Sequence, residues 1–189
     1  MLAAQLSVRI GEKELAQIEN DRLLEIYNGH PAVHNESGGW VPSLEEIWDI
    51  LLTGGKRIYG IAVDDAHSFQ GEFSADRSNP GRGWISVRAR SLDAAEIMQQ
   101  LEAGQFYAST GVRLADVVTE EDRFEIHIAL REDFRYTTTF IGSGGRVLSV
   151  SSENPAVYTL QGRERYVRAK VTDSRGDAAW VQPVFIITP

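Results

Sequence analysis

The sequence places an aspartate and a histidine two residues apart at the end of an apolar segment. Residues 58–63 (IYGIAV) are followed at once by Asp64, Asp65, Ala66 and His67. Sites in barrels and open α/β sheets form at the carboxyl ends of strands. If the strand geometry continues, Asp65 and His67 point to the same side, and a carboxylate and an imidazole could meet one divalent cation. The structural alternative is a capping aspartate followed by a surface histidine.

A second apolar segment, residues 23–28 (LLEIYN), carries a carboxylate in its interior. A lone glutamate in such a segment needs a partner or an exit to solvent. One hypothesis places Glu25 or Asn28 behind the metal ligands, where they would orient them. The alternative is a structural role for Glu25, in a buried ion pair or hydrogen bond.

Two histidines and an arginine in predicted loops are further candidates for lining the same site. His30 and His34 have the spacing of helical metal ligands, but Gly29 and Pro31 disfavour a helix there. Either histidine remains a candidate ligand or substrate contact. Arg82 lies among glycine and proline, where its guanidinium could reach an anionic substrate such as phosphate. An exposed turn arginine is equally consistent with that setting.

The elements that would position these residues alternate between strand and helix. Ser43 and Glu46 form a capping box, which predicts the start of a helix that ends at Gly54. Ser91 is the expected cap of a second helix, with its apolar residues on one face. Strands are predicted at 23–28, 58–63 and 84–89, and the segment 106–111 follows the second helix. This order predicts an α/β layer with parallel strands over residues 1–115.

The pattern changes after about residue 115. Phe124, Ile126, Ile128 and Leu130 alternate with more polar residues, which is typical of a half-buried strand. Further strand-like runs follow, and turn signals separate them without helices. The sequence therefore predicts a second, all-β domain over residues 116–189 with the architecture of a small β-sandwich.

Composition excludes several function classes. The 189 residues carry 19 basic and 27 acidic side chains, a net charge of −8, so nucleic acid is not an expected partner. An acidic cation site fits this balance, and so does a solvated acidic surface. Without cysteine there are no disulfides and no thiolate metal sites. The apolar start, residues 1–10, is too short for a signal or membrane segment, so we expect a cytoplasmic protein with no membrane partner.

Several segments, taken in chain order, are together similar to one known family. They are LLEIYNGHP (23–31), the S-x-E-x-x-W-D segment (43–49), GKRIYGIAVDDAH (55–67), NPGRGW (79–84) and FYASTGV (106–112). They resemble the carboxyl-terminal half of PHP-superfamily (polymerase and histidinol phosphatase) metallohydrolases, in the CehA/McbA-like branch. Residues 166–185 also resemble the extra β-rich domain that follows the barrel in such proteins.

This resemblance implies a distorted (β/α)₇ barrel with divalent metals, such as Zn, Mn or Fe, at the carboxyl ends of its strands. Members of the family typically hydrolyse phosphoesters, so a small anionic ester is the implied substrate. The last metal motif of the family, D-x-H, falls on Asp65 and His67. Glu25, His30 and Arg82 lie in matching segments.

The sequence departs from the family in its other metal motifs. The opening H-x-H, the Thr-Asp-His segment, the glutamate ligand and the further histidines are missing. Because a catalytic divalent ion usually needs at least three protein ligands, we expect a carboxyl-terminal fragment of a metal-dependent hydrolase that is inactive alone. Two alternatives are a non-catalytic scaffold whose sandwich binds a partner, and a fragment that self-assembles into a homo-oligomer to cover its open barrel edge.

Overall fold

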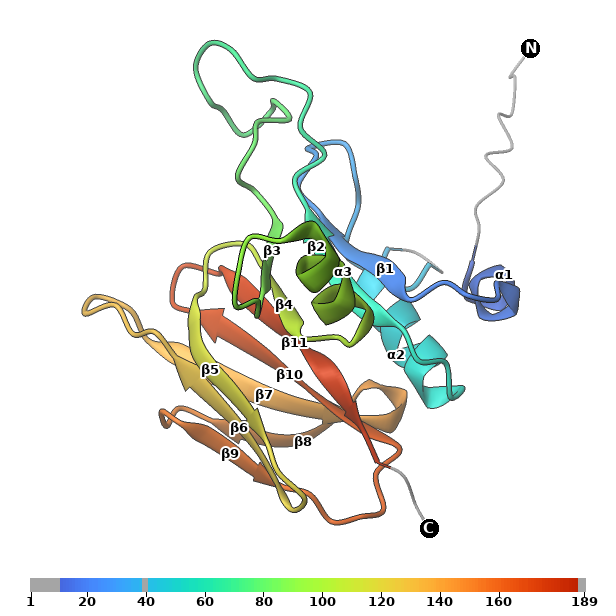
Figure 1. The fold of residues 1–189 in the computed structure, drawn as a ribbon. Coiled ribbons are helices and arrows are strands. Elements are labelled where there is room, and N and C mark those ends of the chain that lie inside the picture. The colour runs from blue at the N-terminus through green and yellow to red at the C-terminus, as the bar shows by residue number, and fades with distance from the viewer. Residues whose placement is uncertain (1–10, 39–40, 187–189) are drawn as a thin grey trace.

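A computed structural model of the chain describes residues 11–38 and 41–186 (Figure 1). The expectation for the apolar start falls on residues 1–10 and so lies outside the described part. No helix within the described ranges is long and apolar enough to cross a membrane.

The first part of the chain forms a small parallel sheet with helices. A short helix, α1 (Glu12–Gln17), precedes strand β1 (Leu23–Asn28), and helix α2 (Leu44–Thr53) leads to strand β2 (Tyr59–Val63). β1 and β2 pair in parallel, so both strands end at the same edge of the sheet.

The start of α2 has the predicted capping box. Ser43 Oγ accepts a hydrogen bond from the Glu46 amide at 3.1 Å, and the Ser43 amide donates to Glu46 Oε2 at 2.7 Å. The next helix, α3 (Ala94–Glu102), is capped by Asp93 rather than by the predicted Ser91: Asp93 Oδ1 accepts hydrogen bonds from the amides at positions 95 and 96. Ser91 instead donates its hydroxyl to Glu96 Oε2.

The prediction of parallel strands fails beyond β2. Strand β3 (Trp84–Val87) pairs antiparallel with β4 (Phe106–Ser109), and the other edge of β4 pairs antiparallel with β11 (Ala178–Phe185). A strand–helix alternation shows only that the chain returns across the sheet. The alternation cannot show that β4 also pairs with β11, a strand some 70 residues later in the chain. That antiparallel pairing accompanies the direction of β4, and no local pattern contains it.

The rest of the described chain forms antiparallel sheets. A six-stranded sheet has the order β3-β4-β11-β10-β7-β8, and a three-stranded sheet has the order β5-β6-β9. The bounds are β5 (Leu114–Thr119), β6 (Arg123–Ile128), β7 (Tyr136–Gly142), the 3₁₀ turn η1 (Ser143–Gly145), β8 (Arg146–Ser151), β9 (Ala156–Thr159) and β10 (Tyr166–Asp173).

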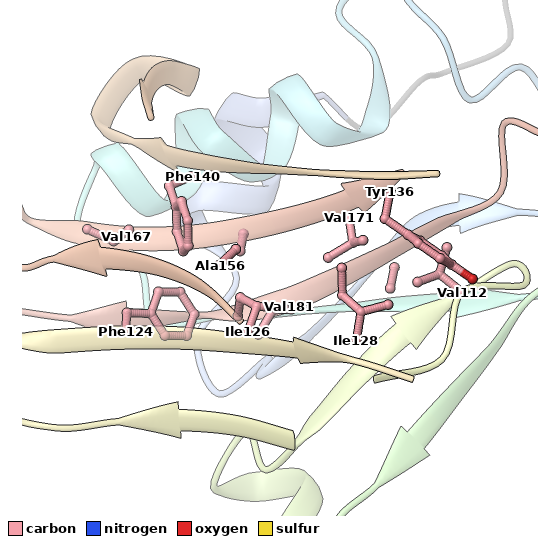
Figure 2. Packing of buried hydrophobic residues seen from close by; sticks show 12 residues of the cluster. Val112, Phe124, Ile126, Ile128, Tyr136, Phe140, Ala156, Val167, Val171 and Val181 are labelled. Carbon is pink, nitrogen blue, oxygen red and sulfur yellow. The ribbon is translucent and has the colours of Figure 1, made fainter. Parts of the chain in front are cut away.

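The six-stranded sheet is the middle one of three layers. On one face it packs against the three-stranded sheet, and Figure 2 shows Phe124 and Ile126 of β6 pointing toward Phe140 and Val171 in the interior between them. On its other face α2, β1 and β2 cover it, with Trp48 buried in a second core. Each face of the sheet thus buries alternate residues of the same strands.

A mixed α/β part followed by mostly antiparallel β-sheets agrees with the predicted fold class. Within residues 11–38 and 41–186 the parallel strands do not close into a barrel, because β1 and β2 form a sheet of only two strands. The six-stranded sheet takes β3 and β4 from before residue 115 and its other strands from after it. The division into domains at residue 115 stays a prediction.

A buried ion pair joins α2 to the middle sheet. Arg168, which is 2% exposed, donates from Nε to Asp49 Oδ1 at 2.8 Å and from Nη2 to Asp49 Oδ2 at 2.6 Å. The hydroxyl of Tyr166 donates to the same Asp49 Oδ1 at 2.8 Å. Glu45 lies beside this pair, 3.4 Å from Arg168 Nη1 and in contact with Lys170 Nζ. Because a buried charge is costly without a partner, these contacts hold α2 at one place on the sheet.

Candidate metal-binding site

The parallel pairing of β1 and β2 brings the two predicted groups of polar residues together. Asn28, the last residue of β1, lies opposite Val63, the last residue of β2. The pairing continues past the strands, since the Gly29 amide donates to the Val63 carbonyl at 2.8 Å. The two loops that follow carry His30 on one side and Asp65 with His67 on the other, so these side chains meet at the carboxyl edge of the sheet.

Asp65 and His67 lie in contact, although the strand geometry on which their prediction depended ends at Val63. His67 Nε2 lies 3.2 Å from Asp65 Oδ1, and the two side chains are 68% and 39% exposed, respectively. Asp65 has a φ of 48°, in the left-handed region that residues other than glycine seldom adopt. Such backbone conformations cluster at functional sites. Here it turns the chain out of β2.

The separation of these two atoms matches that of two ligands on one ion. Two ligand atoms at about 2.1 Å from a cation, at angles between octahedral and tetrahedral, lie about 3.0–3.4 Å apart. The observed 3.2 Å between Asp65 Oδ1 and His67 Nε2 falls within that range, and it is equally the distance of a direct ion-pair contact between the two side chains. The donors are a carboxylate oxygen and an imidazole nitrogen, which are ligands that Zn and Mn accept.

Asn28 connects the other residues of the site. Its Nδ2 donates to Glu25 Oε1 at 2.9 Å and lies 3.3 Å from Asp65 Oδ2, while its Oδ1 accepts from the His30 amide at 2.8 Å. The Asn28 side chain is buried, whereas Glu25 is exposed. Glu25 is therefore hydrogen-bonded at the surface rather than in a buried ion pair, and Asn28 stands behind Asp65 in the manner of an orienting residue.

The two histidines of the first loop differ in their surroundings. The ring of His30 lies edge-on to that of His67, with 5.7 Å between centroids. Nδ1 of His30 accepts from the Ala32 amide at 3.1 Å, so Nε2 is the nitrogen left to meet a ligand. His34 is exposed in the same loop, and the structure does not bring it into the group around Asp65.

Arg82 and Asp64 tie the long β2–β3 loop to the end of β1. Arg82 Nη1 donates to the carbonyls of Gly29 at 3.2 Å and Ala75 at 3.3 Å, and its Nη2 donates to the carbonyl of Ser74. Asp64 Oδ2 accepts from the backbone amide at position 81 at 2.7 Å. The guanidinium predicted to meet an anionic substrate is thus occupied with backbone carbonyls, and the loop that it holds extends away from the sheets (Figure 1).

Three residues of this region escaped the sequence analysis. Ser78, 6% exposed, accepts from the His67 amide through its carbonyl at 2.9 Å and its Oγ at 3.2 Å. Asn79, 1% exposed, accepts from the Ser74 amide and donates to the carbonyl at position 68. The Asn35 side chain accepts from the Asn28 amide through Oδ1 at 2.7 Å and donates from Nδ2 to the Asn28 carbonyl at 2.9 Å. The only signal in the sequence was an asparagine before proline at Asn79, a common turn dipeptide.

The site offers part of a ligand set. In the part of the chain that the structure describes, no three His, Cys, Asp or Glu residues gather closely enough to hold a metal ion. Catalytic divalent ions usually have three protein ligands and an open position. Asp65 and His67 alone would fill at most two of those positions.

The chain matches no family model, no curated protein and no solved structure in the comparisons with known proteins. The resemblance to PHP metallohydrolases consequently stays a prediction, and the site rests on its own geometry.

Proposed function

We propose that the chain carries one half of a divalent-metal centre of hydrolase type, at the carboxyl ends of β1 and β2, with Asp65 and His67 as ligands. The observation that carries the proposal is the 3.2 Å approach of Asp65 Oδ1 and His67 Nε2 at a strand end. A bound divalent cation acidifies water and offsets charge that develops on an ester such as a phosphoester.

The surrounding residues support these two ligands. Asn28 holds one oxygen of Asp65, which leaves the other free to face His67. Ser78 fixes the backbone of His67 from a buried position. His30, whose Nδ1 is bonded to the Ala32 amide, is the nearest candidate for contacting a substrate through Nε2. Together they support a pre-arranged pair of donors, which lowers the entropic cost of binding an ion.

The missing ligands must come from outside the described residues, either from a further polypeptide segment or from another chain. The complete centre would be the site of hydrolysis of small anionic esters, in the manner of PHP-type enzymes. The barrel arrangement implied by the family would supply those ligands; on the same resemblance we propose that β1 and β2 are this chain's part of the barrel and that the antiparallel sheets correspond to the β-rich domain that follows it.

Metal binding to matched variants tests the ligands. Calorimetric titration of the protein with Mn²⁺ is expected to show weak binding that Asp65→Ala and His67→Ala each weaken at least tenfold. His127→Ala is the control, because His127 Nε2 lies 3.1 Å from Glu125 Oε2 in an otherwise similar pair on β6. Equal loss in all three variants, or no effect of the first two, would contradict the assignment.

A phosphoesterase assay tests the claim that the half-site is incomplete. With p-nitrophenyl phosphate and either Mn²⁺ or Zn²⁺, the chain alone is expected to give no turnover above background. Turnover that Asp65→Ala and His67→Ala abolish would show a complete centre and overturn that part of the proposal.

A non-catalytic scaffold is the second candidate. It is favoured by the incomplete ligand set within the described residues and by the use of Arg82 for loop carbonyls rather than for an anion. The two candidates differ in the titration: a scaffold gives no Mn²⁺ binding that depends on Asp65 and His67.

A further inference from the structure

The side-chain amide of Asn28 lies between two carboxylates from different strand ends. Its Nδ2 donates to Glu25 Oε1 at 2.9 Å and lies 3.3 Å from Asp65 Oδ2. Glu25 is exposed, and the Asp65 side chain is 39% exposed, so water and ions can reach both carboxylates. Neighbouring carboxylates repel each other and attract cations. Here an NH₂ group takes the position between them.

The backbone of β1 is irregular where it brings Glu25 to Asn28. Residues three apart in a regular strand point to opposite faces of the sheet, yet the Asn28 amide meets the Glu25 carboxylate. The register of β1 against β2 shifts between Glu25 and Tyr27, which leaves Ile26 as an extra residue in the strand. Such a bulge re-aims side chains and is frequent beside functional sites. This bulge and the left-handed turn at Asp65 direct both carboxylates to one amide.

The Asn28 side chain is held with its nitrogen toward the carboxylates. Asn28 Oδ1 accepts from the His30 amide at 2.8 Å, so a half-turn of the side-chain amide would bring two donors together. The backbone is fixed as well, because Asn35 hydrogen-bonds both the N–H and the carbonyl of Asn28. With the side chain buried, Nδ2 stays the atom that faces Glu25 and Asp65.

We propose that Asn28 limits this strand edge to a single divalent cation, because its amide occupies the place between Glu25 and Asp65 that a second cation would take. The inference rests on the proposed half-site, in which the other oxygen of Asp65 and His67 hold the single ion. The NH₂ group offers hydrogens and no acceptor, so it satisfies both carboxylates and binds no metal. Asp65 is thereby kept from bridging two ions as carboxylates do in two-metal hydrolases.

A carboxylate in place of the amide would convert this contact into a ligand set. Aspartate has nearly the shape of asparagine, so in Asn28→Asp an oxygen replaces Nδ2, which lies 2.9 Å from Glu25 Oε1 and 3.3 Å from Asp65 Oδ2. Oxygens at about 2.1–2.5 Å from one ion lie about 3.0–3.5 Å apart at a right angle. Three carboxylates suit Ca²⁺, which takes oxygen ligands and does not require His67.

Calcium titration of matched variants tests the role of Asn28. The unsubstituted protein is expected to bind Ca²⁺ only weakly in calorimetry, and Asn28→Asp is expected to bind it about tenfold or more tightly. Asn154→Asp is the control for added negative charge, because Asn154 hydrogen-bonds the backbone of Ile128 far along the chain from the site. Equal Ca²⁺ affinity in the unsubstituted protein and Asn28→Asp, or an equal gain in Asn154→Asp, would overturn the proposal.

The gain in Ca²⁺ affinity must also depend on Glu25. A double variant that combines Glu25→Gln with Asn28→Asp again has one amide and one carboxylate at this contact, and its net charge equals that of the unsubstituted protein. This double variant is expected to lose the gain. If it kept the full gain, the new carboxylate would bind Ca²⁺ without Glu25, contrary to the proposal.

Thermal unfolding keeps the test valid if Asn28→Asp is less stable. Adjacent carboxylates repel one another, so this variant is expected to unfold at a lower temperature than the unsubstituted protein when cations are removed. Ca²⁺ should raise its midpoint, because a ligand that binds the folded state stabilises it. The midpoints of the unsubstituted protein and of the double variant should not respond to Ca²⁺. A midpoint of Asn28→Asp that Ca²⁺ leaves unchanged would contradict the proposal.

Two further measurements separate this inference from the proposed function. The Ca²⁺ gain of Asn28→Asp is expected to persist when His67→Ala is added, since the second site has only oxygen ligands. Counting bound Mn²⁺ by electron paramagnetic resonance is expected to give one ion per unsubstituted chain. A second Mn²⁺ ion that Glu25→Gln removes would overturn the inference and leave the half-site intact. Mn²⁺ binding that ignores Asp65 and His67 would overturn the half-site, and the Ca²⁺ titration would still decide the role of Asn28.

Discussion

The Asn28 side chain contacts residues at the ends of both β1 and β2. It is buried, and its amide contacts Glu25 and Asp65 while its carbonyl oxygen holds the backbone of His30. A buried amide with partners on both atoms resists rotation, so the Asp65 carboxylate that it holds has a defined orientation. Asn28 is therefore a positioning residue of the proposed metal site.

Replacement of Asn28 by alanine is expected to affect both stability and metal binding. Loss of these hydrogen bonds in a buried place should lower the free energy of unfolding by about 1–3 kcal/mol, as measured by urea denaturation. Mn²⁺ affinity should fall as well, because the Asp65 carboxylate loses its partner.

Asn154→Ala is the matched control for this prediction. Asn154 brackets the backbone of Ile128 with two hydrogen bonds far along the chain from the site. Because Asn154 is exposed, its replacement should lower stability less than Asn28→Ala does, and it should leave Mn²⁺ affinity unchanged. If both alanine variants changed Mn²⁺ affinity alike, the effect on the metal site would follow from stability alone.

Sequence reasoning at the residue scale succeeded where neighbours in the chain decide the geometry. The two-residue spacing of Asp65 and His67 correctly suggested that they lie together, but the strand ends at Val63 and the unpredicted left-handed turn at Asp65 sets their geometry. The contact between Asn28 and Asp65 depends on which strands pair, and the partners of Arg82 depend on the path of a long loop. Neither can be derived from residue types.

Ion pairs join helix α2 to strand β10 of the middle sheet that it covers. Burial raises the pKa of Glu45 on α2, but the charges of Lys170 and Arg168 on β10 outweigh it and hold the pKa below its usual range. Since the folded-state pKa lies below the unfolded value, ionised Glu45 stabilises the folded state above the unfolded pKa. That contribution is lost as the pH falls through the folded-state pKa.

Glu45→Gln is expected to remove this pH dependence. The free energy of unfolding of the unsubstituted protein should fall more steeply between about pH 5 and pH 3 than that of the variant, in urea denaturation at each pH. Glu132→Gln, at an exposed loop position, should retain the steeper slope. Parallel curves for the unsubstituted protein and Glu45→Gln would argue against the link between α2 and β10.

Elements were predictable where a local signal defines them. The capping box of α2 and the alternation of β6 are such signals, and both elements are present. Strand β5 was missed because its sequence, LADVVT, does not alternate, and its pairing with β6 has an irregularity between Leu114 and Asp116. The antiparallel direction of β4 follows from its pairing with β11, which no local pattern contains.

The molecule as a whole is organised around a sheet that combines early and late parts of the chain. β4 lies between β3 and β11, so the strands after residue 115 depend on one before it. Trp180 and Tyr166 are buried in the core that the middle sheet shares with α2, β1 and β2. Separation at residue 115 would expose both aromatic side chains and an edge of β11.

A fragment of residues 116–189 is therefore expected not to fold independently. It should lack a cooperative thermal transition by circular dichroism, because it has lost β4 and the layer over Trp180. The full chain is the control and should unfold in one transition. A cooperative transition of the fragment would support an independent β-sandwich and the division predicted from the sequence.

The measurement that tests the proposed half-site most directly is paramagnetic broadening of amide resonances by Mn²⁺ in the intact protein. If Asp65 and His67 are the ligands, signals of these residues and of Asn28 and His30 should broaden first, and those around His127 should persist. Broadening that begins around His127 and Glu125, or that spreads evenly over the acidic surface, would contradict a metal half-site at the ends of β1 and β2.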